Sequence, residues 1–257
     1  MTAIDWKTVS AAVAGPNKAE RGCQDAVAVR RVRVGARDAL VIALADGAGS
    51  AAFGGDAARL IVRTLAGLAV SRLRHRLRSS RRQTLWDLQD MALAFQRARE
   101  AVTLVAQTRG DALRDWGSTG LLAVVTEDAA VLAQLGDGAI CLRHAGVWTC
   151  PIWPDLDGYV NVTTFVTHAH APLQTHMGPP ADALLLVSDG LQPLALDYRS
   201  GQPHAPFCQG VIAELGKSTD GRKLRRDLTA WLGSDAIRAR SDDDISLAMA
   251  LLSERVM

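Results

Sequence analysis

Runs of apolar residues and two amphipathic stretches dominate the pattern of hydrophobic and polar positions along the chain. The apolar runs are 39–44, 121–126, 130–135, 139–143, 183–187 and 245–252. Runs of this length with little polar alternation are typical of strands that are buried on both faces. A shorter segment, 26–29, precedes the first run, and the turn residues around Gly35 and Asp38 predict that the two form a hairpin.

Helical periodicity appears in three places. Apolar residues recur every three or four positions over residues 55–73 and again over 84–108, with Thr84 as the expected N-cap of the second helix. A later helix is predicted over 223–232. Because strands are followed by a helix pair and then by more strands, we expect an α+β layered fold. No repeat or linker divides residues 1–257, so a single domain is predicted.

The composition narrows the class of protein. Hydrophobic residues make up 48% of the 257 residues and charged residues 22%, which is sufficient for a sizeable core. No apolar run is long enough to cross a membrane, and the N-terminus lacks a secretory pattern. The four cysteines are scattered without a CxxC pair, which favours neither disulfides nor zinc. We therefore expect a reduced, cytoplasmic protein with no membrane partner.

A basic run at 72–82 lies between the two predicted helices. Such a run is most often a solvated helix end, and the alternative is a docking patch for an acidic partner. A third interpretation is a nucleic-acid contact. The net charge of +2 and the low aromatic content of 5% argue against it, so no nucleic-acid partner is predicted.

Three acidic residues lie at the ends of predicted strands. Asp46 and Asp189 each follow a buried run and precede a glycine, and Asp243 comes just before the last run. A single Asp-Gly pair is best explained as an ordinary turn. Three carboxylates gathered at one edge, however, repel one another, and a divalent cation removes that cost. All-oxygen ligands favour Mg²⁺ or Mn²⁺.

Two histidines offer a weaker alternative. His168 and His170 would share one face of an extended segment and could together ligate a metal. No other residue nearby has the spacing of a zinc site, so the carboxylate set is the favoured one.

Six short motifs follow one another along nearly the whole chain. They are Gly22-Cys23-Gln24-Asp25, Ala45-Asp46-Gly47-Ala48-Gly49, Gly117-Ser118-Thr119, Gly136-Asp137-Gly138, Val187-Ser188-Asp189-Gly190 and Asp243-Asp244-Ile245-Ser246. Each is weak alone, but their order, with the helices in one gap, resembles the protein phosphatase 2C family of metal-dependent protein phosphatases. The Cys-Gln-Asp of the first motif is most similar to a bacterial branch. The resemblance implies a central antiparallel β-sandwich flanked by helix pairs.

The resemblance also implies ligands for two metal ions at one end of that sandwich. Asp46 is expected to bridge both ions, and the Gly47 carbonyl to bind the second. Asp189 and Asp243 are expected to complete the first site. Asp25 is expected to support the second ion through water.

Further positions follow or depart from the family pattern. Asp137 matches a residue that helps to hold a weaker third ion, and Asp244 stands where Asn is commoner and is expected to lie behind the ligands. Lys18 and Arg21 are both candidates for binding the substrate phosphate, and the spacing does not choose between them. Ala48 occupies the position where some members have a histidine that protonates the leaving group.

The function implied by the resemblance is metal-dependent hydrolysis of phosphoserine or phosphothreonine in proteins. A hydroxide that bridges two Mn²⁺ or Mg²⁺ ions would attack phosphorus in line, with Asp46, Asp189 and Asp243 as the catalytic set. The expected partners are a phosphorylated protein substrate and a cognate Ser/Thr kinase in a bacterial signalling pathway. The alternative is a catalytically weak, phosphatase-like module that binds a phosphorylated partner, which Ala48 modestly favours.

Overall fold

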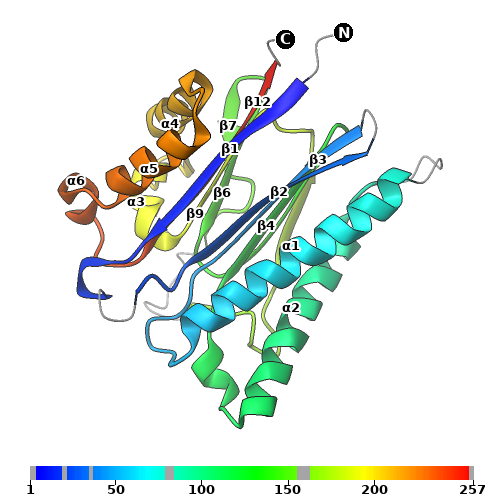
Figure 1. The fold of residues 1–257 in the computed structure, drawn as a ribbon, viewed down its shortest axis with the longest axis vertical. Coiled ribbons are helices and arrows are strands. Elements are labelled where there is room, and N and C mark those ends of the chain that lie inside the picture. The colour runs from blue at the N-terminus through cyan, green and yellow to red at the C-terminus, as the bar shows by residue number, and fades with distance from the viewer. Residues whose placement is uncertain (1–3, 19–21, 35–36, 79–83, 155–162, 255–257) are drawn as a thin grey trace.

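The structure is a computed structural model that describes residues 4–18, 22–34, 37–78, 84–154 and 163–254. Two five-stranded antiparallel sheets stack face to face, and helices cover the outer face of each (Figure 1). The α+β sandwich between helical layers that the sequence predicts is therefore confirmed.

The first sheet has the order β2-β3-β4-β5-β8, and α1 and α2 cover it. Its elements are β2 (Ala26–Val34), β3 (Arg37–Ala45), α1 (Gly54–Arg78), α2 (Leu88–Arg109), β4 (Gly120–Thr126), β5 (Ala130–Leu135) and β8 (Gln174–Gly178). In β3, Val41 and Ala43 pack toward the helices, whereas Leu40 and Ile42 pack toward the second sheet. This double burial explains why the strand lacks polar alternation.

The second sheet has the order β1-β12-β9-β6-β7. Its strands are β1 (Ile4–Val13), β6 (Ala139–His144), β7 (Val147–Thr149), β9 (Ala183–Val187) and β12 (Ile245–Glu254). The helices of this half are α3 (Gln192–Ala195), α4 (Ala205–Lys217), α5 (Gly221–Leu232) and α6 (Asp235–Arg238), with a small ribbon of β10 (Leu196–Asp197) and β11 (Gln202–Pro203). β1 pairs with β12, so both ends of the described chain lie in one sheet.

The start of α2 corrects the expected N-cap. The helix begins at Leu88, and its N-cap is Asp87 rather than Thr84. The Asp87 carboxylate accepts a hydrogen bond from the Asp90 amide at 2.9 Å, and the Asp90 carboxylate accepts one from the Asp87 amide at 3.1 Å. This reciprocal pair satisfies two amides at the helix start, which a lone threonine three residues earlier does not do.

The basic run at 72–82 is only partly a solvated helix end. Residues 72–78 extend α1, and the guanidinium of Arg72 lies 2.8 Å from the carboxylate of Asp90, which Arg76 also contacts. Asp90 is only 2% exposed, so these arginines neutralise a buried charge between the two helices. Arg81 and Arg82 lie outside the described residues. Within the described part of the chain, no helix is long and apolar enough to span a membrane.

Candidate metal centre

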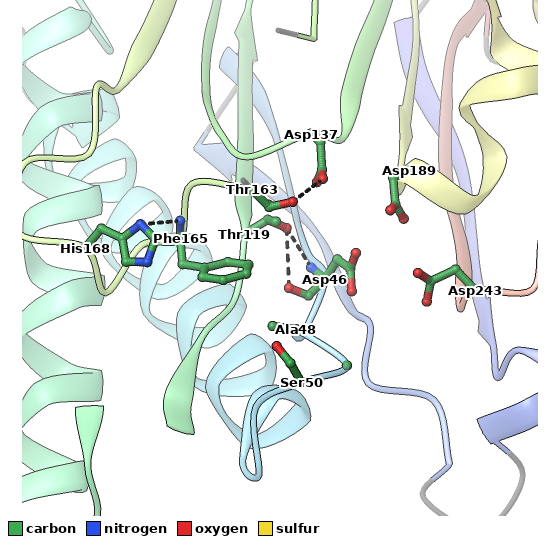
Figure 2. Close-up of a pocket in the computed structure, with 11 residues that line it drawn as sticks. Asp46, Ala48, Ser50, Thr119, Asp137, Thr163, Phe165, His168, Asp189 and Asp243 are labelled. Atoms are coloured by element: carbon green, nitrogen blue, oxygen red, sulfur yellow. Dashed lines mark hydrogen bonds between the residues drawn. The ribbon is translucent and has the colours of Figure 1, made fainter. Parts of the chain in front are cut away.

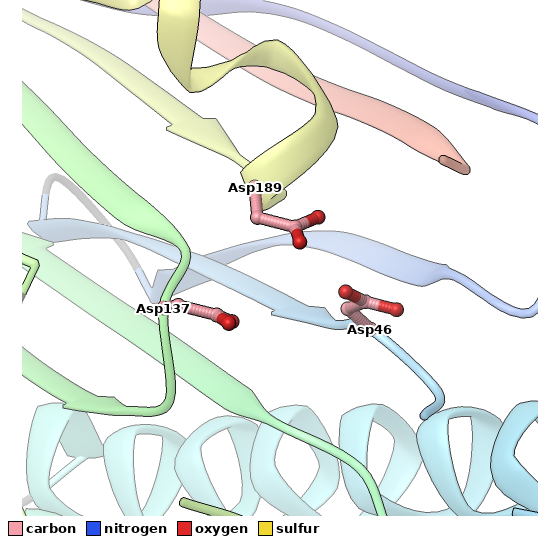
Figure 3. Close-up of side chains that lie close together, drawn as sticks. All are labelled: Asp46, Asp137 and Asp189. Carbon is pink, nitrogen blue, oxygen red and sulfur yellow. The ribbon is translucent and has the colours of Figure 1, made fainter. Parts of the chain in front are cut away.

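Three carboxylates meet at one end of the sandwich. Asp46 follows β3, Asp137 lies in the turn between β5 and β6, and Asp189 follows β9 at the start of a short 3-10 turn (Asp189–Leu191). One oxygen from each lies within 4.8 Å of the others, and Figure 3 shows the three side chains directed toward a common point. Two different sheets thus supply one acidic cluster.

A pocket of about 430 Å³ opens over this cluster. Asp243 lines it together with the three carboxylates, as the sequence predicts for a shared site. Figure 2 shows Thr119 and Phe165 on one side of the pocket and Asp189 and Asp243 on the other. The pocket is large enough to admit a phosphorylated side chain.

The carboxylates of the cluster raise one another's pKa values. Burial raises the pKa of Asp46 well above its usual value, and the charges of Asp25 and Asp189 add to the rise. Burial, followed by the charges of Asp137 and Asp243, raises the pKa of Asp189 to about 7. Such shifts mean that the ionised cluster is costly as it stands, and a bound cation would remove that cost.

Asp25 is the clearest sign that something external completes the site. Its side chain is buried, and neither carboxylate oxygen has a hydrogen-bond partner among the described residues. Burial raises its pKa to about 6, although the neighbouring side chains of Ser246, Asp46 and Ser188 lower it, and the charge of Asp244 adds a smaller rise. Because a buried carboxylate without partners is rare, and every candidate donor here is oxygen, the site fits hard divalent cations such as Mg²⁺ or Mn²⁺.

The loop after β3 is held rigidly beside the start of α1. The amide of Asp46 donates to the Thr119 hydroxyl at 2.9 Å, and the amide of Thr119 donates to the Asp46 carbonyl, also at 2.9 Å. A Cβ on Gly47 would lie 2.4 Å from the backbone carbon of Gly54. Only glycine fits at that position. The two hydrogen bonds between Asp46 and Thr119 show that the motif at Gly117–Thr119 fixes the Asp46 loop.

The last motif ties the first one into place. The buried carboxylate of Asp244 accepts hydrogen bonds from the amides of Gly15 and Gln24, each at 2.8 Å. This position agrees with the expectation that Asp244 lies behind the ligands. Because Gln24 precedes Asp25, this contact also positions Asp25.

Lys18 lies at the edge of the site. Its ammonium group forms an ion pair with Asp243 and lies 3.9 Å from Asp244. Burial lowers its pKa, but the hydrogen bond and charge of Asp243, with the charges of Asp244 and Asp46, raise it above its usual value overall. Lys18 therefore stays cationic next to the pocket. The other candidate for phosphate binding, Arg21, lies outside the described residues.

One wall of the pocket was missed by sequence reasoning. The Thr163 hydroxyl donates to Asp137 at 2.7 Å, and the Phe165 amide donates to Nδ1 of His168 at 3.3 Å. Thr163, Phe165 and His168 all line the pocket. They belong to an irregular stretch without a motif, and only its proline and tryptophan content marked it as unusual.

The alternatives built on other residue types receive no support. Among the described residues, the group of metal-ligand type contains Asp46, Asp137 and Asp189, and no histidine. His168 lines the pocket, whereas His170 is not among the residues that do. Burial, and then the charge of Asp25, raises the pKa of Cys23 to about 12, so its thiol is a poor nucleophile.

The fold and the cluster define a layered sandwich with an acidic metal-binding end. Among known families, the model of Protein phosphatase 2C matches residues 16–233. The chain belongs to this family. The resemblance drawn from the six motifs is thereby confirmed, whereas the assignment to a branch with Cys-Gln-Asp stays a prediction.

Known proteins of this kind match over nearly their whole length. Serine/threonine-protein phosphatase 3 of Escherichia coli (strain K12) is 29% identical over 261 residues, which cover 98% of this chain and 100% of that protein. A Mycobacterium tuberculosis serine/threonine phosphatase, PstP/Ppp, has a TM-score of 0.64 at 17% identity and covers 97% of this chain and 99% of its own.

A third match contains metal. The catalytic domain of the serine/threonine phosphatase PstP in complex with two manganese ions has a TM-score of 0.63 at 18% identity, covering 98% of this chain and 100% of that one. At this identity the match establishes the shared fold. The acidic cluster of the present chain is compatible with metal binding at the end of that fold.

Proposed function

We propose that this protein is a metal-dependent protein phosphatase that hydrolyses phosphoserine and phosphothreonine. The observation that carries the proposal is the cluster of Asp46, Asp137 and Asp189, whose carboxylate oxygens lie within 4.8 Å of one another at the base of an open pocket. Membership of the protein phosphatase 2C family and the similarity to a curated serine/threonine phosphatase support the same activity.

The proposed ligand set is the one that the family resemblance implies. Asp46 and the Gly47 carbonyl would hold two ions, with Asp189 and Asp243 on the first and Asp25 behind the second. Asp137 would take part in a third, weaker site, which its proximity to Asp46 and Asp189 supports. Two Mn²⁺ or Mg²⁺ ions, when bound, would supply a nucleophilic water and neutralise charge on the phosphoryl oxygens.

The chain's own residues would then bind and orient the substrate. Lys18 is the described cation nearest the carboxylates, and its contact with Asp243 supports a role in attracting the phosphate. Ala48 lines the pocket and has no proton to give. Protonation of the leaving group would therefore come from water in the pocket, which predicts slow turnover of substrates with poor leaving groups.

The setting of the reaction is part of the same proposal. A phosphorylated protein is the substrate, and a cognate Ser/Thr kinase in the same pathway supplies it. The four cysteines are free, which supports a reducing, cytoplasmic location. One core of residues from both sheets, among them Leu40, Leu132 and Leu184, supports a single domain over residues 1–257.

The first experiment is hydrolysis of p-nitrophenyl phosphate by the purified protein in EDTA, in Mg²⁺ and in Mn²⁺. We expect activity only with metal, and its loss in Asp189→Asn, which keeps the size of the side chain. The intact carboxylate set argues against the alternative, a catalytically weak module that binds a phosphorylated partner. A folded wild-type protein with no more activity than the variant would contradict the proposal and favour that alternative. A phosphothreonine peptide assayed in parallel tests the preference for proteins.

A further inference from the structure

A groove that contributes nothing to the metal centre runs along the outer side of the sandwich. It lies between α1 and β2, which is the edge strand of its sheet, and has a cavity volume of about 490 Å³. A neighbouring cavity shares Val70 and Arg74 with it and continues to Arg78 near the end of α1. Because they adjoin, we call the two cavities together the α1 groove.

The rim of the α1 groove is basic. It is lined by Arg30 from β2 and by Arg59, Arg63 and Arg74 from α1, all exposed. Arg59 contacts Asp56 at 2.7 Å, whereas Arg63 and Arg74 have no hydrogen-bond or ion-pair partner within the described part of the chain. None of the described residues that line the groove is acidic. Its positive charge is therefore uncompensated by its own walls.

The floor of the α1 groove is apolar. Val62 and Ala66 are nearly fully buried beneath the arginines, and Val27 and Val70 are half-buried. No Phe, Tyr or Trp is among the described residues that line it, and its one ring is that of the exposed His75 near the end of α1, so it offers few of the rings on which nucleic-acid bases commonly stack. A ligand that fits must combine negative charge with aliphatic groups.

The spacing of the arginines gives the groove a direction and a length. Arg59, Arg63 and Arg74, with Val70 between the last two, recur at helical intervals and lie on one side of α1. With a rise of 1.5 Å per residue, Arg59 and Arg74 are about 22 Å apart along the axis. An extended peptide covers that distance with about seven residues.

We propose that the α1 groove binds an extended, acidic peptide segment of a protein partner, with aliphatic side chains on the floor and carboxylates on the arginine rim. Arginine forks match carboxylates in two-point contacts, and exposed arginines without partners cost little to redirect. The proposal uses no residue of the metal centre, so it stands or falls independently of phosphatase activity.

The test is fluorescence anisotropy with a fluorescein-labelled peptide of about ten residues, rich in glutamate with central leucines. It is performed in EDTA, so that turnover plays no part. We expect saturable binding to the wild type and a loss of about tenfold or more in Arg63→Glu/Arg74→Glu. The matched control, Arg222→Glu/Arg225→Glu, changes the charge equally on the exposed face of α5 and should bind like the wild type.

Several outcomes would overturn the proposal. An equal loss of binding in both double variants would show that only net charge matters, and equal binding by the wild type and both variants would place the peptide elsewhere. Absence of saturable binding by the wild type would remove the site. Single-stranded DNA of equal charge that binds more tightly and loses affinity in the same variant would make it a nucleic-acid site. If the glutamate variant unfolds, Arg63→Gln/Arg74→Gln replaces it, with a urea denaturation curve like that of the wild type as the check on folding.

Discussion

Two buried acidic regions of this molecule differ in whether the chain itself supplies partners for the carboxylates. Between α1 and α2, Asp90 is 2% exposed and is contacted by Arg72 and Arg76 while it also caps its own helix. At the end of the sandwich, Asp25 is 7% exposed, and neither of its oxygens has a hydrogen-bond partner among the described residues. The chain compensates the first carboxylate fully and leaves the second unmatched.

The difference separates structural acids from acids that await a ligand. A buried carboxylate with arginines around it has been neutralised during folding, and removal of one partner costs stability. A cluster such as Asp46, Asp137 and Asp189 instead carries raised pKa values at two of its members and gains its counter-charge from outside.

The largest effect is expected at the metal centre. Asp46→Asn removes a negative charge from the predicted bridging ligand, and metal-dependent hydrolysis should fall by about a thousandfold or more. Steady-state rates in Mn²⁺ measure the loss. The control Asp56→Asn alters an exposed aspartate of α1 and should keep its activity. A modest, severalfold loss in Asp46→Asn would remove this residue from the ligand set.

The compensated acid should affect stability instead. Asp90→Ala leaves two arginines without their shared partner and removes half of the helix cap, which should lower the free energy of unfolding by about 3 kcal/mol. Urea denaturation measures it, and the folded fraction should retain its activity. Asp227→Ala, in an exposed pair with Lys223 at 3.2 Å, should cost less than about 1 kcal/mol. Similar losses in both variants would contradict the comparison.

Metal should stabilise the uncompensated region. At a hundred times its dissociation constant, Mn²⁺ bound only to the folded state adds about 2.7 kcal/mol to the free energy of unfolding. A thermal melt should therefore shift upward with Mn²⁺ and return to its starting value with EDTA. The shift should survive in Asp90→Ala and be much reduced in Asp46→Asn. An equal shift in both would place the metal elsewhere.

The pH dependence of the metal-free protein gives a smaller effect. The pKa of Asp25 is about 6 in the folded protein against 3.8 for a free aspartate, and that of Asp189 is about 7. The folded state therefore holds these protons more tightly, and the stability they contribute below pH 4 is lost as pH rises toward 7. In EDTA, Asp25→Asn should flatten this decline near pH 6. A wild-type profile parallel to that of the variant would contradict it.

The smallest effect is expected at the wall of the pocket. Thr163→Val keeps the shape of the side chain but removes the hydroxyl that donates to Asp137 at 2.7 Å. A single hydrogen bond to a charged group contributes about 1.5–3 kcal/mol, and solvent can replace part of it in an open pocket. We expect a severalfold rise in the Mn²⁺ concentration needed for half-maximal activity. An unchanged metal titration would show that the Thr163 hydroxyl does not affect metal binding at Asp137.

The site residues that lie at the ends of strands could be predicted from the sequence. Asp46 and Asp189 follow uninterrupted apolar runs, so both the strand and the position of the acid can be predicted. The wall formed by Phe165 and His168 has no such frame, because its residues reach the pocket through an irregular segment whose path depends on tertiary contacts. The α1 groove could not be predicted either. In the sequence, the arginines of α1 are typical of a solvated helix face, and only the packing of β2 beside α1 makes them the rim of a groove.

The fold was predicted in outline but not at its margins. The strand β1 (Ile4–Val13) was missed because Lys7, Thr8 and Ser10 interrupt its apolar residues, and it gains its place by pairing with β12. The helix α4 (Ala205–Lys217) follows the short strand β11 (Gln202–Pro203), has Pro206 in its first turn, and was missed as well. In both cases partners distant in sequence decide the structure.

The contacts of Asp244 with Gly15 and Gln24 join the start of the chain to a residue that is synthesised 220 or more positions later. A nascent chain that has emerged only as far as Gly190 already contains five of the six motifs, yet it lacks Asp243 and the carboxylate that fixes the first loop. Its N-terminal strand β1 also waits for β12. A ribosome-bound chain should therefore hydrolyse no phosphoester until residues 243–254 have left the exit tunnel.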